Sequence, residues 1–183
     1  RREDANLLTG QAIFIDDIEL PNMLHGAVLR SPHASANILS IDASAAIAMP
    51  GVHAVLTHAD LGSANDPMPL LNDDPGFVYP RTHRALAVDQ VRFTGEPVAF
   101  VIGETRYICE DALDLIDVRY DIRTAVVDVM TAAADGAPLV HDDTTSNIAC
   151  STENKTGNVA RAFEQADVVI REVLRPERGA AQP

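Results

Sequence analysis

The feature that most constrains the fold is a tight bend that runs directly into an apolar segment. Residues 95–103 have the sequence GEPVAFVIG. Gly95 permits a tight backbone turn, and Pro97 lacks the backbone donor that a regular ladder would use. The unbroken apolar run from Val98 to Ile102 predicts a buried strand. This bend and strand are expected to lie in the core.

A helix and a second strand are expected directly after this segment. Thr105 is placed to cap a helix over residues 106–116, whose apolar residues follow helical spacing and form one face. Residues 117–120 then return as a strand, with Val118 and Tyr120 on the same side. The helix and strand together predict one compact packing unit.

A similar helix-then-strand unit is expected earlier in the chain. Asp42 can cap a helix over residues 43–49, and the Pro50-Gly51 pair ends it before a strand over residues 52–56. The other elements are short and unevenly spaced, without the regular βαβ series of a doubly wound sheet. This favours an α+β fold with mixed β-sheet units and flanking helices. Further strands are predicted over residues 12–15, 23–30, 37–41, 85–88 and 167–174, and a short helix is predicted to open at 157–158.

A proline-rich stretch separates the two helix-then-strand units. Residues 62–82 hold four prolines and a short polar run, so they predict a long irregular loop. Loops of more than about 12–15 residues without structure are uncommon, and they are often functional or interface-forming. Disorder of this loop is the alternative, and the sequence leaves its role open.

Composition excludes several classes of protein. The chain has 183 residues, 14 basic and 27 acidic, with a net charge of −13 and scattered arginines, which argues against nucleic-acid binding. Cys109 and Cys150 lie far apart without metal-ligand spacing, so a reducing cytoplasmic location is the simpler expectation. No apolar run is long enough for a membrane span, and no signal-peptide pattern begins the chain. Because the chain begins at Arg1, we expect a fragment of a longer protein.

Each candidate catalytic group in the sequence has a simpler structural interpretation. Ser31 and His33 lie two residues apart, but this spacing alone sets no nucleophile–base geometry, and a turn after a strand is the simpler interpretation. The acidic runs at 73–74 and 141–143 lack a second ligand at helical or hairpin spacing, so surface loops are expected. Cys109 is expected to be a buried structural residue. We therefore predict no catalytic, cofactor-binding or metal-binding residue in this chain.

Short phrases distributed along nearly the whole chain resemble one family, in the same order. The family is the molybdenum hydroxylases, which include xanthine dehydrogenase, aldehyde oxidase and the large subunit of bacterial carbon monoxide dehydrogenase. The opening RED at residues 2–4 is more similar to bacterial, separately encoded large subunits. The other matching phrases are LTG at 8–10, FIDDI at 14–18, PNMLH at 21–25, RSPHA at 30–34, SID at 40–42, PGV at 50–52, GEPVA at 95–99, VRYD at 118–121, GNV at 157–159 and ADVV at 166–169.

The resemblance implies an α/β-hammerhead domain at the start of a molybdopterin-binding large subunit. It places that domain at residues 1–128, and a connector with the truncated first elements of the molybdopterin-binding domain at 129–183. The phrase RPERG at 175–179 resembles the first strand that enters that domain. The family's catalytic glutamate and pterin-binding segments lie further downstream, so no catalytic residue or molybdenum contact is carried over, and the fragment alone is predicted to be inactive.

The same resemblance implies an oxidoreductase assembled from several parts. The family hydroxylates an aldehyde or an N-heterocycle, or oxidises carbon monoxide, with water as the oxygen source. A molybdenum-pterin cofactor carries the reaction, and 2Fe-2S clusters and FAD in partner subunits or domains receive the electrons. The expected partners are the downstream molybdopterin-binding domains, the iron–sulfur and FAD subunits and a small-molecule substrate, in a hetero-oligomer.

Two alternatives remain open at the level of the sequence. A stand-alone scaffold or small-molecule-binding module could use the same hammerhead fold, because a fold does not determine a function. A family member that has lost its catalytic glutamate is also compatible with these residues. The substrate, the electron acceptor and the pterin form are not specified by any phrase in the chain.

Overall fold

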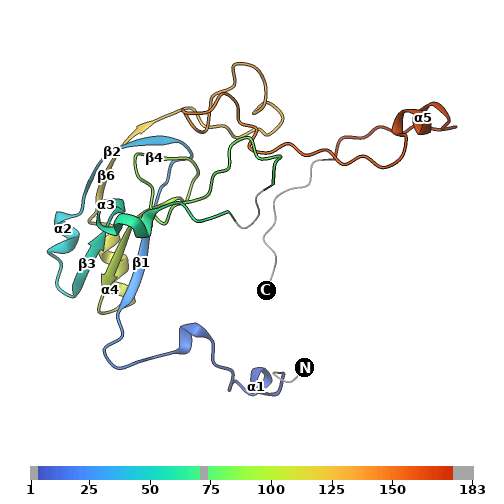
Figure 1. Cartoon of the computed structure of the whole chain (residues 1–183). Coiled ribbons are helices and arrows are strands. Elements are labelled where there is room, and N and C mark those ends of the chain that lie inside the picture. Colours follow the sequence, from blue (N-terminus) through green and yellow to red (C-terminus); the bar gives the residue numbers. More distant parts are fainter. Residues whose placement is uncertain (1–3, 71–73, 175–183) are drawn as a thin grey trace. The chain divides into compact units, whose positions relative to one another are not determined.

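The structure is a computed structural model that describes residues 4–70 and 74–174, and the chain divides into two compact units. The first unit comprises residues 1–150, and it contains two small antiparallel sheets (Figure 1). The second unit comprises residues 151–183, and it contains helix α5 (Val159–Glu164). The phrase at 175–179 lies outside the described residues. Helices combined with small antiparallel sheets confirm the α+β prediction.

The first sheet is built around the predicted apolar strand. Its strands are, in spatial order, β1 (His25–Arg30), β5 (Pro97–Gly103) and β3 (Val52–Leu56), and both neighbours run antiparallel to β5. Because β5 is central, both of its edges are hydrogen-bonded to other strands.

In the second sheet, a strand from the early part of the first unit pairs with two strands from its later part. Its strands are, in order, β4 (Gln90–Val91), β2 (Ala36–Asp42) and β6 (Asp117–Ile122). β2 pairs antiparallel with both neighbours, so Ala36 lies opposite Val91 on one side and Ile122 on the other. The strand expected over residues 117–120 is confirmed, and it continues two residues further.

Both faces of β5 are buried, which explains its continuous apolar sequence. Ala99 and Val101 pack in one cluster with Cys109 and Ala112 of helix α4 (Arg106–Leu113). Val98 belongs to a second cluster with Ala36, Ala87 and Val91. Successive residues of a strand point to opposite faces, so this one strand contributes to two apolar clusters.

The helix starts follow from side-chain caps. The Thr105 hydroxyl accepts a hydrogen bond from the Ile108 amide at 3.2 Å, as the sequence predicted. Asp42 accepts one from the Ser44 amide at 3.0 Å at the start of helix α2 (Ser44–Ile47). The other helical segments are α1 (Asp4–Leu8), η1 (Ile15–Asp17), α3 (His58–Leu61) and η2 (Gly62–Asn65).

Three expected strands are wrong. Residues 12–14 are irregular and Ile15 begins η1, while residues 167–174 form no strand because no described segment pairs with them. Residues 85–88 are also irregular, for a different reason. The Asn65 side chain accepts from the Leu86 amide at 2.8 Å and donates to its carbonyl at 3.0 Å. The backbone amide and carbonyl of Leu86 are therefore hydrogen-bonded to the side chain of Asn65, whereas in a strand they would be bonded to the backbone of a neighbouring strand.

The segment after β6 returns to the proline-rich loop. Phe77 and Cys150 form an isolated antiparallel bridge, and Tyr79 and Thr145 share a hydrogen bond between their hydroxyl groups at 2.7 Å. Residues up to Cys150 thus belong to the first compact unit. The domain boundary predicted after residue 128 is based on the resemblance to the family, not on contacts within the structure, so it stays a prediction.

Candidate functional site

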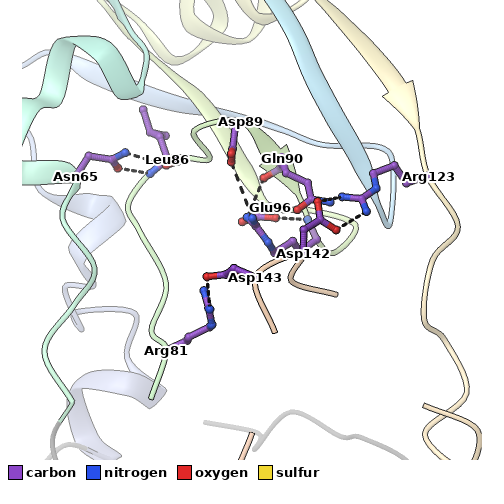
Figure 2. Close-up of polar contacts among 10 residues, drawn as sticks. Asn65, Arg81, Leu86, Asp89, Gln90, Glu96, Arg123, Asp142 and Asp143 are labelled. Atoms are coloured by element: carbon purple, nitrogen blue, oxygen red, sulfur yellow. Dashed lines mark hydrogen bonds and ion pairs between the residues drawn. The ribbon is translucent and has the colours of Figure 1, made fainter. Parts of the chain in front are cut away.

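Two adjacent aspartates attach the segment after β6 to the rest of the first unit (Figure 2). Arg123, which follows β6, donates to both carboxylate oxygens of Asp142, at 2.8 and 2.5 Å. Arg81 of the proline-rich loop donates to Asp143 at 2.5 Å. These hydrogen bonds hold the pKa of each carboxyl below its ordinary value. The bidentate Arg123 pair fixes orientation as well as charge.

The proline-rich loop is held from its other end by Asn65 (Figure 2). Asn65 is only 3% exposed, and its side chain makes the two hydrogen bonds to Leu86 described above. Its backbone carbonyl accepts from Nη1 of Arg84 at 2.9 Å. Because Asn65 is the last residue of η2, these hydrogen bonds attach residues 84–86 directly to that helix.

The bend before β5 joins the end of β1 to the start of β5. The Gly95 amide donates to the Ser31 carbonyl at 2.8 Å, and the Ser31 amide donates to the Glu96 carbonyl at 2.9 Å. The Glu96 carboxylate accepts from the Arg92 amide at 2.5 Å. Arg30 Nη1 also donates to the Gly95 carbonyl at 2.9 Å. The bend thus serves as a structural junction.

The structure places the other sequence candidates in structural contacts. The Ser31 hydroxyl donates to the His33 carbonyl and accepts from the His33 amide, both at 3.0 Å. The His33 ring makes an edge contact with Tyr120, with the ring centroids 5.0 Å apart. Cys109 is buried, its Sγ lies 3.3 Å from the His25 carbonyl, and burial raises the pKa of its thiol.

The chain has only two cysteines, whereas an iron–sulfur cluster is usually held by four thiolates. Within residues 4–70 and 74–174, no three His, Cys, Asp or Glu side chains lie close enough to hold a metal ion. Cys109 and Cys150 are free thiols, one buried and one exposed. Asp74 accepts from the Gly76 amide at 2.7 Å in a local turn, and Asp73 lies outside the described residues. No reaction step is assigned to these residues.

The sequence did not single out the arginines of this region. Arg81 and Asp143 are 62 residues apart, and Arg123 and Asp142 are 19 apart. No helical or strand spacing connects such partners, so only the tertiary structure brings them together. The one available signal was the 141–143 run, which was interpreted as a surface loop.

Comparison with known proteins identifies the class of domain and then its family. Residues 9–124 match the family described as "Aldehyde oxidase and xanthine dehydrogenase, a/b hammerhead domain". The chain belongs to this family, and the expected hammerhead fold is confirmed. The match covers both sheets and helix α4.

Curated relatives agree with this assignment. The nicotine 6-hydroxylase large subunit of Paenarthrobacter nicotinovorans is 37% identical over all of this chain, which spans 22% of that protein. The carbon monoxide dehydrogenase large chain of Afipia carboxidovorans is 42% identical over 78% of this chain, an alignment that covers 17% of that protein. The chain thus spans about a fifth of the length of these relatives.

Solved structures show the same fold. Quinoline 2-oxidoreductase from Pseudomonas putida 86 superposes with a TM-score of 0.84 at 37% identity, over 94% of this chain and 22% of that chain. Aldehyde oxidoreductase from Desulfovibrio gigas gives a TM-score of 0.80 at 27% identity, over 92% of this chain and 19% of that chain. Within the described part of this chain, no helix is long and apolar enough to cross a membrane.

Proposed function

We propose that this chain is the N-terminal domain of the molybdopterin-binding large subunit of a molybdenum hydroxylase. The observation that carries the proposal is the hammerhead family match over residues 9–124, extended by 37% identity across the whole chain to a hydroxylase large subunit. Residues 1–128 are the hammerhead domain, and residues 129–183 are the connector and the start of the molybdopterin-binding domain.

The intact protein would oxidise an aldehyde or an N-heterocycle by hydroxylation, or carbon monoxide, with water as the oxygen source. The molybdenum-pterin cofactor supplies this redox chemistry, and iron–sulfur and FAD subunits take up the electrons. Among the described residues of this chain, no three His, Cys, Asp or Glu side chains form a group that could hold a metal ion. The domain's own role is to pack against the cofactor-binding domains, to shape the path of the substrate and to contribute subunit contacts.

Exposed apolar side chains support this packing role. In the first unit, Leu8, Ile13 and Ile15 are 87%, 78% and 89% exposed, although side chains of this kind are usually buried. In the second unit, Ile170 and Leu174 are similarly exposed. Apolar surface in this amount is typical of a face that other parts of a protein cover.

The names of the relatives support a multi-subunit assembly. A subunit gamma of the 6-hydroxypseudooxynicotine dehydrogenase complex is 34% identical over this whole chain. We place the assembly in the cytoplasm, with separate subunits for the iron–sulfur clusters and FAD. The stand-alone scaffold alternative requires that the reading frame stop soon after residue 183, so sequencing beyond that residue distinguishes the two.

Activity of the purified assembly tests the proposal. The intact protein would be isolated through a tag, and dye reduction would be measured with an aldehyde, an N-heterocycle and carbon monoxide in parallel. We expect co-purifying subunits and reduction of the dye with at least one of the three. A protein that purifies alone and is inactive with all three classes would contradict the proposal.

A further inference from the structure

A cavity of about 310 Å³ lies between the proline-rich loop, the residues on either side of strand β4 and the segment after β6. We call it the arginine cavity. It is lined by Pro67, Arg81, Thr82, Arg84, Ala87, Val88, Asp89, Arg92 and His141. Among these described lining residues, three are arginines and one is a carboxylate. This is an unusual concentration of positive charge in a chain whose net charge is −13.

The three guanidinium groups are neutralised to different extents. Arg81 is paired with Asp143 at 2.5 Å. Arg92 lies 3.9 Å from Asp89, whose side chain is 82% exposed, so water screens this pair. Arg84 donates to the neutral carbonyl of Asn65, and no described carboxylate lies within 4.0 Å of it. Of the three arginines, Arg84 is thus the one whose guanidinium has no carboxylate partner among the described residues.

Two buried nitrogen atoms of the lining residues have no hydrogen-bond partner among the described residues. They are Nε of Arg92 and Nδ1 of His141. The third unpartnered atom, Nε2 of Gln90, belongs to a residue that does not line the cavity. Buried polar groups are almost always hydrogen-bonded, because an unpaired donor loses its hydration without compensation. Neither atom is open to water, so these two nitrogens show that the cavity wall holds unpaired polar groups, and a ligand would contact them only after a shift of the side chains.

We propose that the arginine cavity binds a small oxyanion, with a phosphate or carboxylate group held by Arg84, Arg92 and His141. A guanidinium presents a planar set of donors that matches such groups, and hydrogen bonds between ions of opposite charge are the stronger kind. The volume lies at the lower end of the range for small-ligand pockets, about 300–1,000 Å³. It therefore suits an oxyanion on a small organic skeleton.

The surroundings of His141 are consistent with this assignment. Burial lowers the pKa of its imidazole, and the charges of Arg92 and Arg81 lower it further, against the opposing effect of Asp143 and Asp142. Burial is the largest of these effects, and the two arginines and the two aspartates act on the imidazole in opposite directions. An oxyanion bound beside it would raise the pKa of His141.

Phosphate binding to the intact protein tests the proposal. The protein would be prepared in phosphate-free buffer and titrated with inorganic phosphate, and separately with acetate, by calorimetry at constant ionic strength. We expect saturable binding of at least one of the two anions. Arg84→Gln should weaken that binding by about tenfold or more, as expected for the loss of a charge-assisted hydrogen bond.

Matched variants separate a built site from general charge. Arg92→Lys keeps the charge and removes the planar set of guanidinium donors, so it should also weaken binding. Arg119→Gln removes the same charge from an exposed position on β6 outside the cavity, so it should leave binding unchanged. The absence of saturable binding for both anions, or an equal loss in Arg84→Gln and Arg119→Gln, would overturn the proposal. Neither result bears on the proposed hydroxylase function, which is tested separately.

Discussion

Gly95 holds the bend before β5 with a φ of +92°, a conformation that residues with a Cβ rarely adopt. A Cβ built at this position meets no atom within 4 Å, so the obstacle to substitution is backbone strain rather than a clash. Gly26 illustrates the opposite case. Its added Cβ would lie 2.3 Å from Cζ of Phe100, so this glycine provides space for an aromatic ring.

The first prediction follows from the strain at Gly95. Gly95→Val should destabilise the domain by more than about 1 kcal/mol, because a β-branched residue is especially unfavourable at positive φ. Gly95→Asn is the matched control and should cost less, since Asn tolerates positive φ better. Hydrogen-exchange mass spectrometry of peptides that cover β5 measures the difference. Equal protection in Gly95→Val and in the unaltered protein would disprove the role assigned to this glycine.

The second prediction concerns His141. Its pKa in the folded protein is lowered by burial and by Arg92 and Arg81, against Asp143 and Asp142. As pH falls below the ordinary histidine value of about 6.5, the unfolded chain binds more protons than the folded one, so stability falls. Above that pH, both states are neutral and this contribution to the pH dependence disappears.

The His141→Gln variant tests this directly. Thermal unfolding in phosphate-free buffer at pH 7.5 and pH 5.5 should show a smaller loss of melting temperature on acidification than in the unaltered protein. If the two proteins lose the same amount, His141 does not contribute to the loss of stability at low pH.

At the level of elements, helix α4 depends on its first turn. The Thr105 hydroxyl accepts from the Ile108 amide, and the helix places Cys109 and Ala112 in the core against β5. Thr105→Ala should therefore destabilise the domain by about 1 kcal/mol, whereas Thr105→Ser retains the cap. Exchange rates of α4 peptides provide the measurement. Similar exchange in the two variants would show that the cap contributes little.

The sequence predicted those elements whose signals are local. The strand at 52–56 has the predicted bounds, and β5 is longer than its apolar run by one residue at each end. The helix predicted over 106–116 ends three residues early, since the C-cap lies at Asp114. These elements combine an apolar pattern with a cap or a breaker, so the local sequence largely determines them.

The errors arose where distant residues decide the structure. Leu86 lies in an apolar tetrapeptide, but its backbone is bonded by the side chain of Asn65, 21 residues away. The arginine cavity was missed for the same reason, because His141 and Arg84 are distant in sequence and meet only in the folded domain. A single sequence contains no spacing from which such contacts could be predicted.

For the whole molecule, the fold of this chain and the chemistry of the intact protein are separate matters. The family match and the solved relatives establish a hammerhead domain, and the chain spans about a fifth of its curated relatives. The described residues offer no ligand set for a metal ion, and apolar side chains are exposed in both units. The exposed apolar side chains agree with the proposed packing of this domain against the rest of the protein.

The metal content of the intact protein shows whether this chain belongs to a molybdenum hydroxylase. The protein would be tagged in its native context and purified with its associated subunits, and molybdenum and iron would be quantified by mass spectrometry. The account predicts about one molybdenum per large subunit, with iron in the co-purifying subunits. A pure, folded protein that contains neither metal would contradict the hydroxylase assignment.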